Sequence, residues 1–248
     1  MTGIQKRFGP VNALIGVDLE VQPGEVHGLL GGNGAGKTTL MNVLYGLYDA
    51  DGGAIEIDGS TATIKSPRDA LAAGVGMVHQ TFLQVDNYSG LENVVLGAEA
   101  GGSIFSMNLD AARAKVQDLS TRFGLAVDPD AIVEELPVGI RQRVEILKAL
   151  YRGSKILILD EPTTNLTPQE VDDLFGSIHA MVAEGMSVIL ITHKIQETMS
   201  ICDCMTIMRL GEKIAVLNKV DTTPDELAAI MVGETAGSDA RAVVLGED

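Results

Sequence analysis

Aromatic residues are scarce in this sequence. Tryptophan is absent, and aromatic residues make up only 4% of the 248 positions. Hydrophobic residues still account for 46% of the chain, so small aliphatic side chains must fill its core. A core of this kind is typical of a parallel sheet that is buried on both faces. The length suffices for one large domain or two small ones.

Cysteine is nearly absent as well, because only Cys202 and Cys204 are present. Two cysteines separated by one residue are too few for a zinc site unless further ligands lie nearby. We expect two reduced thiols at the start of a strand, which suits a protein of the cytosol.

Basic charge is in short supply. Lysine and arginine number 18 against 34 aspartates and glutamates, which gives a net charge of −16. Such a surface repels nucleic-acid phosphates and anionic lipid headgroups, and no run of basic residues offsets it. The charge balance therefore argues against a nucleic-acid partner.

Long hydrophobic runs are also missing. No apolar run approaches the length that crosses a bilayer. The N-terminal stretch MTGIQKRFGP lacks the apolar core of a signal peptide. We therefore expect a protein that stays outside the bilayer but could dock on a component that spans it.

Short apolar runs alternate with helical patterns along the chain, which predicts an α/β fold. Strand patterns cover 25–32, 75–80, 155–160 and 187–193, and hairpin patterns cover 53–65 and 204–219. Between 89 and 152 the patterns are mainly helical, and Asn108 or Asp110 could cap the second of these helices. We predict four parts: a first core part with a β-hairpin region at 1–88, a helical subdomain at 89–152, a second core part at 153–234, and a tail or linker stub at 235–248.

A glycine-rich loop carries the clearest chemical signal. GGNGAGKTT fits the phosphate-loop pattern G-x-x-x-x-G-K-[ST], from Gly31 to Thr38, between a strand and a helix. Glycines let backbone N–H groups close around phosphate oxygens, and the helix start adds a favourable partial charge. Lys37 is placed to reach the β- and γ-phosphates and the Thr38 hydroxyl to bind Mg²⁺. The candidate binding residues here are Gly31, Gly32, Asn33, Gly34, Ala35, Gly36, Lys37, Thr38 and Thr39.

Two acidic residues end a buried strand in ILILDEP. Asp160 is predicted to hold Mg²⁺, and Glu161 is placed to act as a general base on a water that attacks the γ-phosphate. An acidic pair at a strand end is weak evidence alone. The acidic pair becomes stronger evidence for a nucleotide site when it occurs together with the phosphate loop, because the carboxyl ends of neighbouring parallel strands meet at one ligand crevice.

Gln80 and His193 follow two further strand patterns. Each would lie on the same sheet edge as the phosphate loop. His193 is predicted to donate a hydrogen bond to the γ-phosphate, and Gln80 to sense Mg²⁺ or the attacking water. The other histidines, His27, His79 and His179, have no such placement and are interpreted as structural.

Taken in order, these motifs resemble those of the ATP-binding cassette (ABC) ATPases over nearly the whole chain. The matching elements are Phe8 within KRFGPVNAL, the phosphate loop, Gln80, LPVGIRQR, ILILDEP, TTNLT and His193. The resemblance implies a P-loop NTPase fold in which a mixed sheet core has flanking helices and an inserted helical subdomain. It also implies that the adenine stacks on Phe8, that the cofactors are ATP and Mg²⁺, and that a second cassette, in the same or another chain, is a partner.

The LPVGIRQR segment, residues 136–143, resembles the family's signature segment, which in the family caps the ATP held by the partner cassette. Relative to the common L-S-G-G-Q pattern, Pro137 replaces the serine, Val138 the first glycine and Ile140 the glutamine. Pro137 lacks a hydroxyl and an N–H, so we expect a cap weakened by roughly 1–3 kcal/mol. Thr167 stands where the family usually has an aspartate that helps to join the two sites.

The segments GVGMVHQTF and 136–163 resemble the first cassette of bacterial sugar and nucleoside importers. Such importers commonly carry two cassettes in a chain of roughly double this length, which suggests an isolated first half or a stand-alone subunit. The start close to Phe8 favours truncation, since the strand before it is expected to be short or missing. The resemblance implies an ATPase on the cytoplasmic face of the membrane, peripheral to it through permease subunits. The alternatives are an ATP-dependent binding or dimerisation module with weak or no hydrolysis, and a soluble cassette outside transport.

Overall fold

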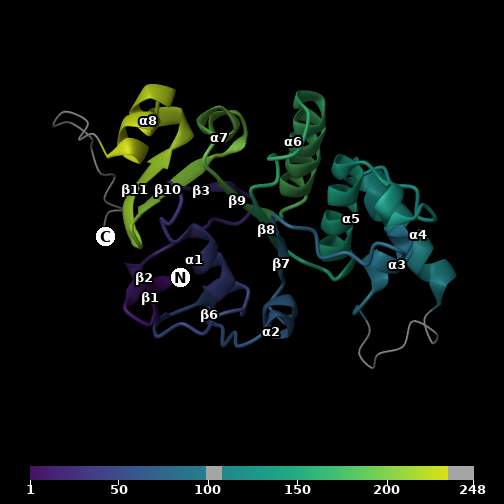
Figure 1. The fold of residues 1–248 in the computed structure, drawn as a ribbon, viewed down its shortest axis with the longest axis horizontal. Coiled ribbons are helices and arrows are strands. Elements are labelled where there is room, and N and C mark those ends of the chain that lie inside the picture. Colours follow the sequence, from purple (N-terminus) through teal and green to yellow (C-terminus); the bar gives the residue numbers. More distant parts are fainter. Residues whose placement is uncertain (99–107, 234–248) are drawn as a thin grey trace.

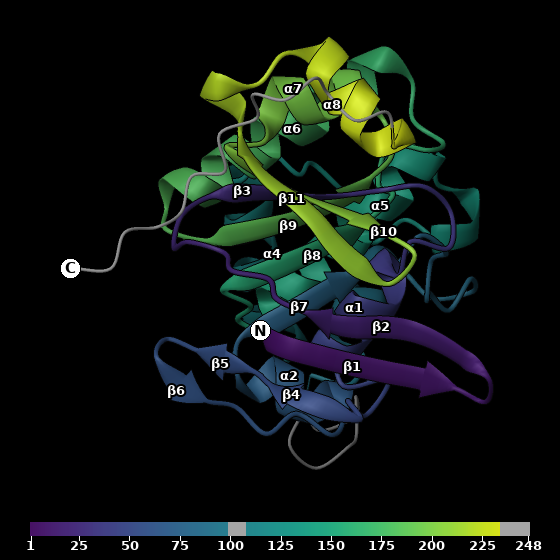
Figure 2. The ribbon, with the colours of Figure 1, turned by 90° about the vertical axis from the view of Figure 1, so that its left-hand side faces the viewer.

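The computed structural model describes residues 1–98 and 108–233, and a six-stranded mixed sheet runs through its centre (Figures 1 and 2). The strand order is β11-β10-β3-β9-β8-β7, and only the edge strand β11 runs antiparallel to its neighbour. The strands are β3 (Val26–Leu30), β7 (Val75–Val78), β8 (Ile156–Asp160), β9 (Ser187–Thr192), β10 (Cys204–Arg209) and β11 (Glu212–Asn218). The apolar runs at 75–78 and 187–192 are buried along their whole length, as expected for central parallel strands.

Alternating side chains of the sheet feed two hydrophobic clusters, one on each face. Leu157 and Leu159 of β8 belong to one cluster, and Ile158 between them belongs to the other. Helices α6 (Pro168–Ala183), α7 (Ile195–Ile201) and α8 (Pro224–Val232) cover the first face. Helices α1 (Lys37–Leu44) and α2 (Pro67–Ala72) lie on the second face, together with an antiparallel sheet (Figure 2).

That antiparallel sheet has the order β2-β1-β4 and contains β1 (Thr2–Phe8), β2 (Val11–Val17) and β4 (Gly52–Ala54). The expectation that the strand before Phe8 is short or missing was wrong, because β1 is seven residues long. The predicted hairpin at 53–65 is also smaller than expected. Only β5 (Glu56–Ile57) and β6 (Ser60–Thr61) pair there, while β4 pairs with β1. Gly53, at φ +96°, allows this pairing because a Cβ there would lie 2.6 Å from the carbonyl oxygen of Thr2.

The described elements between β7 and β8 are all helical: α3 (Gly90–Val95), α4 (Leu109–Arg122), the 3₁₀ turn η2 (Val133–Glu135) and α5 (Val138–Tyr151). We call these elements the helical insert, and Figure 1 places them at the opposite end of the molecule from α8. Asn108 rather than Asp110 caps α4, since its Oδ1 accepts a hydrogen bond from the N–H of Ala111 at 3.1 Å. The expected tail at 235–248 lies outside the described residues.

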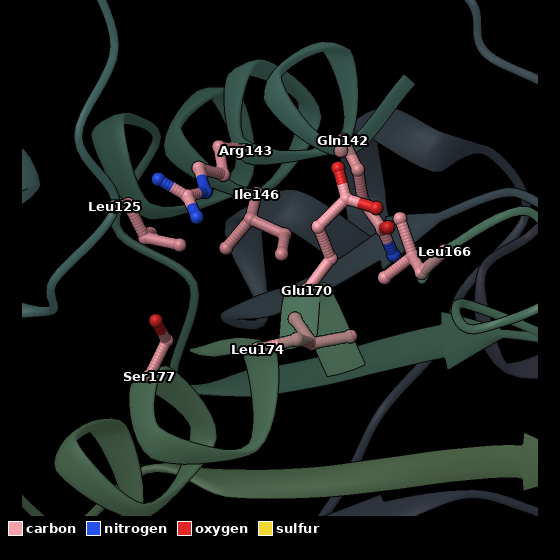
Figure 3. A pocket seen from close by; sticks show the side chains of 9 residues that line it. Leu125, Gln142, Arg143, Ile146, Leu166, Glu170, Leu174 and Ser177 are labelled. Atoms are coloured by element: carbon pink, nitrogen blue, oxygen red, sulfur yellow. The ribbon is translucent and has the colours of Figure 1, made fainter. Parts of the chain in front are cut away.

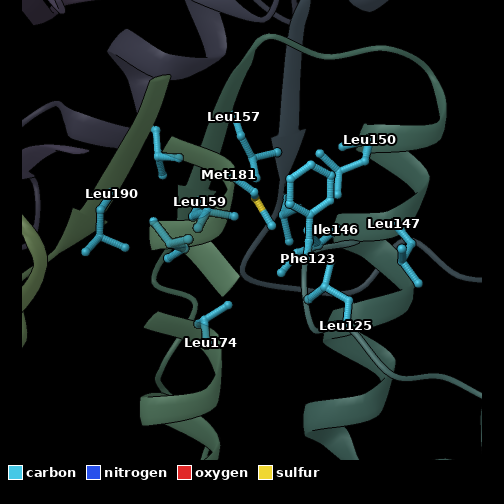
Figure 4. Packing of buried hydrophobic residues seen from close by; sticks show 14 of the residues in the cluster. Phe123, Leu125, Ile146, Leu147, Leu150, Leu157, Leu159, Leu174, Met181 and Leu190 are labelled. Atoms are coloured by element: carbon cyan, nitrogen blue, oxygen red, sulfur yellow. The ribbon is translucent and has the colours of Figure 1, made fainter. Parts of the chain in front are cut away.

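The insert is attached to the sheet by apolar packing (Figure 4). Ile146 and Leu150 of α5 are buried in one cluster with Phe123, Leu125 and Leu157. Burying a side chain of this size stabilises a fold by about 1.5–3 kcal/mol. The contact of α5 with the sheet therefore fixes where the N-terminus of α5 lies.

The two cysteines are free thiols. Cys204 begins β10 as expected, whereas Cys202 is the C-cap residue that follows α7 and is fully buried. Burial raises the pKa of the Cys202 thiol to about 12, so that thiol is inert. None of the helices in residues 1–98 and 108–233 has the length and apolar character that crossing a membrane requires.

Candidate functional site

Four neighbouring parallel strands end at one edge of the central sheet, and each delivers a sequence-predicted residue there. Leu30 pairs with Thr192, and Asp160 pairs with Ile191, so the ends of β3, β8 and β9 are level. Val78 pairs with Leu159, which brings the end of β7 to the same edge. The residues that follow are Gly31, Gln80, Glu161 and His193.

The loop from Gly31 to Gly36 joins β3 to α1. Two of its positions, Gly31 and Gly36, have a backbone conformation that favours glycine. Gly31 has φ +150°, and a Cβ there would lie 2.2 Å from the carbonyl oxygen of Met208. Gly36 has φ +101° and precedes α1 without any side-chain cap, so the first N–H groups of α1 have no capping side chain. Ala35 is buried, whereas Gly32, Asn33 and Gly34 are exposed. The loop is thus an exposed rim of backbone N–H groups at a helix start, a geometry that binds anions.

Lys37 closes this loop. Its Nζ donates hydrogen bonds to the carbonyl oxygens of Gly31 at 2.7 Å and Gly32 at 3.1 Å. Burial lowers the pKa of Lys37, and the nearby charges of Glu161 and Asp160 oppose that shift. An ammonium group therefore lies inside the loop, facing the two carboxylates of ILILDEP.

Asp160 and Thr38 form an oxygen-only pair beside the loop. Burial raises the pKa of the Asp160 carboxyl, and a hydrogen bond from the Thr38 side chain opposes that shift. Within the described residues no group of three or more His, Cys, Asp or Glu side chains forms a metal site. A carboxylate with one hydroxyl still fits Mg²⁺, because this ion keeps several waters and takes the remaining ligands from phosphates. Thr39 is half-buried in the first turn of α1.

Glu161 and His193 are in direct contact. Glu161 Oε1 lies 2.8 Å from His193 Nδ1, and the two side chains are 12% and 54% exposed. Glu161 adopts φ +50°, a conformation that a non-glycine residue holds only at a cost in backbone strain. The carboxylate reaches His193, the residue that follows β9.

A pocket joins this edge of the sheet to the helical insert. It is lined by Gln80, Asp160 and Glu161 from the strand ends, by Val138 and Gln142 from α5, and by His79, Phe82, Pro162, Asn165 and Leu166. Gln80 is thus grouped with the acidic pair, as predicted. The presence of Val138 shows that the N-terminus of α5 lies next to the acidic pair of its own chain.

Phe8 ends β1, and its ring is 42% exposed. The loop packs against the neighbouring strand β2, since a Cβ at Gly36 would lie 2.8 Å from the carbonyl oxygen of Ala13. Tyr48 meets the Phe8 ring edge-to-face with the ring centroids 5.1 Å apart. The sequence analysis did not single out Tyr48, and its only signal was a second aromatic residue soon after the phosphate-loop helix.

The signature segment starts α5. Pro137 is the N-cap residue and makes no side-chain hydrogen bond, so the helix begins at Val138. Gly139 lies against Glu170 of α6, because a Cβ at position 139 would meet Glu170 Oε1 at 2.4 Å. The same carboxylate accepts hydrogen bonds from the N–H and the hydroxyl of Thr167, both at 2.8 Å. Glu170 points into a small pocket between α5 and α6 (Figure 3).

Comparisons with known proteins agree with this arrangement. The profile of the ABC transporter family matches residues 14–164. The chain is 46% identical over 235 residues to the nucleoside import ATP-binding protein NupA of Lactococcus lactis subsp. cremoris, covering 95% of this chain and 46% of that protein. It is 45% identical to the glucose import ATP-binding protein TsgD13 of Haloferax volcanii, covering 94% of this chain and 47% of that protein.

The chain therefore spans about half the length of the curated relatives it matches. Among solved structures, a nucleotide-free ATP-binding cassette from an ABC transporter aligns with a TM-score of 0.82 at 26% identity and covers 95% of this chain and 97% of that one. The expected cassette fold, a mixed sheet with flanking helices, is thereby confirmed. The chain belongs to the ABC transporter family, as an ATP-binding cassette.

Proposed function

We propose that this chain binds ATP with Mg²⁺ and hydrolyses it to power a membrane importer of sugars or nucleosides. The observation that carries the proposal is the meeting of Lys37, Asp160, Glu161 and His193 at one sheet edge. The printed names of the relatives, which import nucleosides and glucose, support the solute class.

In this proposal the loop residues hold the triphosphate. The residues that surround the phosphates are Gly31, Gly32, Asn33, Gly34, Ala35, Gly36, Lys37, Thr38 and Thr39, and the adenine stacks on Phe8. Lys37 exchanges its two carbonyl partners for phosphate oxygens, which are stronger acceptors. Thr38 and Asp160 hold Mg²⁺, with Gln80 as a further ligand, and the ion neutralises phosphate charge.

Glu161 acts as the general base. Its carboxylate removes a proton from water as the water oxygen attacks the γ-phosphorus and the bond to the ADP oxygen breaks. His193 holds the carboxylate through Nδ1–H, and a ring that is protonated at both nitrogens also donates from Nε2 to a γ-phosphate oxygen. Gln80 positions the attacking water.

The proposed partners are a second cassette and membrane permease subunits, which place the chain at the cytoplasmic face of the membrane as a peripheral subunit. The net charge of −16 supports a protein partner rather than nucleic acid. The signature segment would reach the ATP of the partner cassette with the N–H of Gly139, while Pro137 contributes no donor.

One observation favours a second function, ATP-dependent pairing with little hydrolysis: Pro137 is the N-cap residue of α5 and offers neither an N–H nor a hydroxyl to a γ-phosphate. The two functions are distinguished by measuring the uptake of labelled ribose, glucose and guanosine in cells that lack this protein. We expect uptake of at least one solute to fall, and the full-length wild-type protein but not its Glu161→Gln variant to restore it. Equal restoration by both proteins would favour pairing alone, and unchanged uptake of all three solutes would overturn the importer.

A further inference from the structure

Asn33 and Gly34 lie in the middle of the phosphate loop, and they are the only place in the sequence where an asparagine precedes a glycine. Both residues are exposed. The side-chain amide of an asparagine is open to attack by the backbone nitrogen of the next residue, and glycine hinders that attack least because it has no side chain. The pair is therefore a candidate site of chemical change within the loop.

Few contacts restrain this pair. Among the described residues, neither the Asn33 side chain nor the Gly34 N–H has a hydrogen-bond partner. One hydrogen bond closes the turn around the pair, from the N–H of Ala35 to the carbonyl oxygen of Gly32 at 3.2 Å. Gly34 has φ +76°, and a Cβ at this position would meet nothing within 4 Å. The amide of Asn33 is therefore free to turn toward the nitrogen of Gly34.

The charges around the loop favour the attack. The reaction needs the backbone N–H of Gly34 to lose its proton, and it passes through an intermediate with a negatively charged oxygen. Lys37 Nζ lies within the loop, bonded to the carbonyl oxygens of Gly31 at 2.7 Å and Gly32 at 3.1 Å. The uncapped start of α1 adds a positive partial charge at the same place. Both groups stabilise negative charge that develops during the attack, just as they would stabilise a bound phosphate.

We propose that Asn33 is a self-modification site, at which the nucleotide-free chain converts the side-chain amide to a carboxylate. The Gly34 backbone nitrogen forms a bond to Cγ of Asn33, the bond from Cγ to Nδ2 breaks, and the proton lost by the backbone nitrogen leaves with Nδ2 as ammonia. Water then adds to a carbonyl carbon of the resulting succinimide ring and opens it. The product is an aspartate or an isoaspartate at position 33, and water is the only other reactant.

The link to nucleotide rests on the proposed function, since it takes the loop to be the triphosphate site. A carboxylate at position 33 places negative charge where the phosphates bind, so the modified chain repels nucleotide. An isoaspartate also lengthens the backbone of the loop. Bound triphosphate prevents the reaction in turn, because its negative charge opposes deprotonation of the Gly34 nitrogen. The site therefore inactivates chains that stay without nucleotide.

The test follows position 33 in the whole protein. The protein is incubated with Mg²⁺ at mildly alkaline pH, with and without a fluorescent, non-hydrolysable ATP analogue whose binding is measured on the same samples. Mass spectrometry of the digested protein then gives the fraction of Asn33 that carries a carboxyl group. Asn12 and Asn165 are internal controls, because both are exposed but precede alanine and leucine.

We expect the Asn33 amide of the free protein to convert at least about tenfold faster than the amide of either control asparagine, because only Asn33 precedes a glycine. With the analogue at about ten times its Kd, the conversion rate should fall about tenfold, since only the remaining free protein reacts.

Variants separate the causes. Gly34→Ala should convert at least about tenfold more slowly, because its Cβ crowds the attacking nitrogen. Lys37→Met should slow conversion in the free protein by about threefold or more, whereas Lys155→Met, which removes a lysine at the opposite end of β8, should convert like the parent. Asn33→Asp carries the charge of one product and should bind the analogue about tenfold more weakly than Asn33→Ser, which adds no charge.

An Asn33 amide that lasts as long as those of the two control asparagines would overturn the proposal. Equal conversion in the free and the analogue-bound protein would overturn it as well. A folded protein that binds no analogue would instead refute the proposed function, while the conversion of Asn33 in the free protein would still decide the modification itself. The two failures are therefore distinguishable on the same samples.

Discussion

Glu161 and His193 directly follow the neighbouring strands β8 and β9, and their side chains are joined by a 2.8 Å hydrogen bond between Oε1 and Nδ1. Glu161 makes this contact from a backbone conformation with φ +50°. One carboxylate oxygen is engaged by the histidine, and the other is left to take a proton from water. Backbone strain of this kind lowers the stability of the fold and is typical of functional sites, which agrees with the proposed role of Glu161.

The phosphate loop should tolerate a Cβ at one glycine and not at another. Gly31→Ala places a methyl group 2.2 Å from a backbone oxygen, whereas Gly34→Ala, at φ +76°, meets nothing within 4 Å. We expect Gly31→Ala to lower the free energy of unfolding by about 3 kcal/mol or more and Gly34→Ala by only about 1 kcal/mol. Urea unfolding of both variants measures the difference. Equal losses would show that the close approach to Met208 does not exist in solution.

Lys37 should contribute to the affinity for ATP and not to the stability of the folded protein. Lys37→Met removes an ammonium group whose pKa burial already lowers, so we expect the nucleotide-free variant to be at least as stable as the parent. Its affinity for ATP should fall about 10- to 100-fold, the value of a charge-assisted hydrogen bond. Titration calorimetry and thermal unfolding give the two quantities. Lys155→Met, at the opposite end of β8, is the matched control and should bind ATP like the parent.

Gly139 and Glu170 should be energetically coupled. A methyl group at position 139 displaces the Glu170 carboxylate, which forms the capping box of α6 with Thr167. We expect Gly139→Ala to lower the Tm by about 2–4 °C. Glu170→Ala should lower it by a similar amount, and the double variant by no more than either single change. Strictly additive losses in thermal unfolding would contradict the close approach of Gly139 to the Glu170 carboxylate.

Glu145 should make stability depend on pH. Burial raises the pKa of this carboxyl of α5, and the charge of Lys148, whose Nζ lies 3.9 Å from Oε1, opposes that shift. Among the described residues Oε1 has no hydrogen-bond partner. A carboxyl group with a raised folded-state pKa adds stability below its unfolded pKa, and that stability is lost as the pH rises through the folded pKa. We expect the free energy of unfolding of Glu145→Gln, relative to the parent, to increase as the pH rises from about 4 to 7. A constant difference across that range in denaturant titrations would show that Glu145 does not titrate with a raised pKa.

The central part of the fold followed from sequence because its signals are local. Strands β8 and β9 each contain a run of four apolar residues, and the loop after β3 carries its own pattern, so both the strands and the edge where they end were predictable. The sheet containing β1 was not. Its pairing shifts register between Ile4 and Lys6, which breaks the alternation of buried and exposed residues, and its partner β4 is a three-residue strand with two glycines.

The candidate site also contains a part that was predictable from the sequence and a part that was not. The residues at the strand ends were predictable because parallel strands place them at one edge. The contacts of Arg141 with Gln84 and of Gly139 with Glu170 join positions that are 57 and 31 apart in the sequence, and no local pattern marks either pair. Helix α8 was not predicted, although the sequence contains a helix start signal there, with Thr223 as the N-cap residue and Pro224 after it.

The account as a whole stands on four strand ends acting on one triphosphate, and Glu161→Gln tests that most directly. Phosphate release in a single turnover and the mass of the complex by light scattering are measured with MgATP, for the parent and the variant. We predict that the variant keeps ATP affinity within about threefold, slows phosphate release by about 100-fold or more, and accumulates as ATP-bound pairs. Phosphate release at the parental rate, or a folded variant that binds no ATP and forms no pairs, would contradict the account.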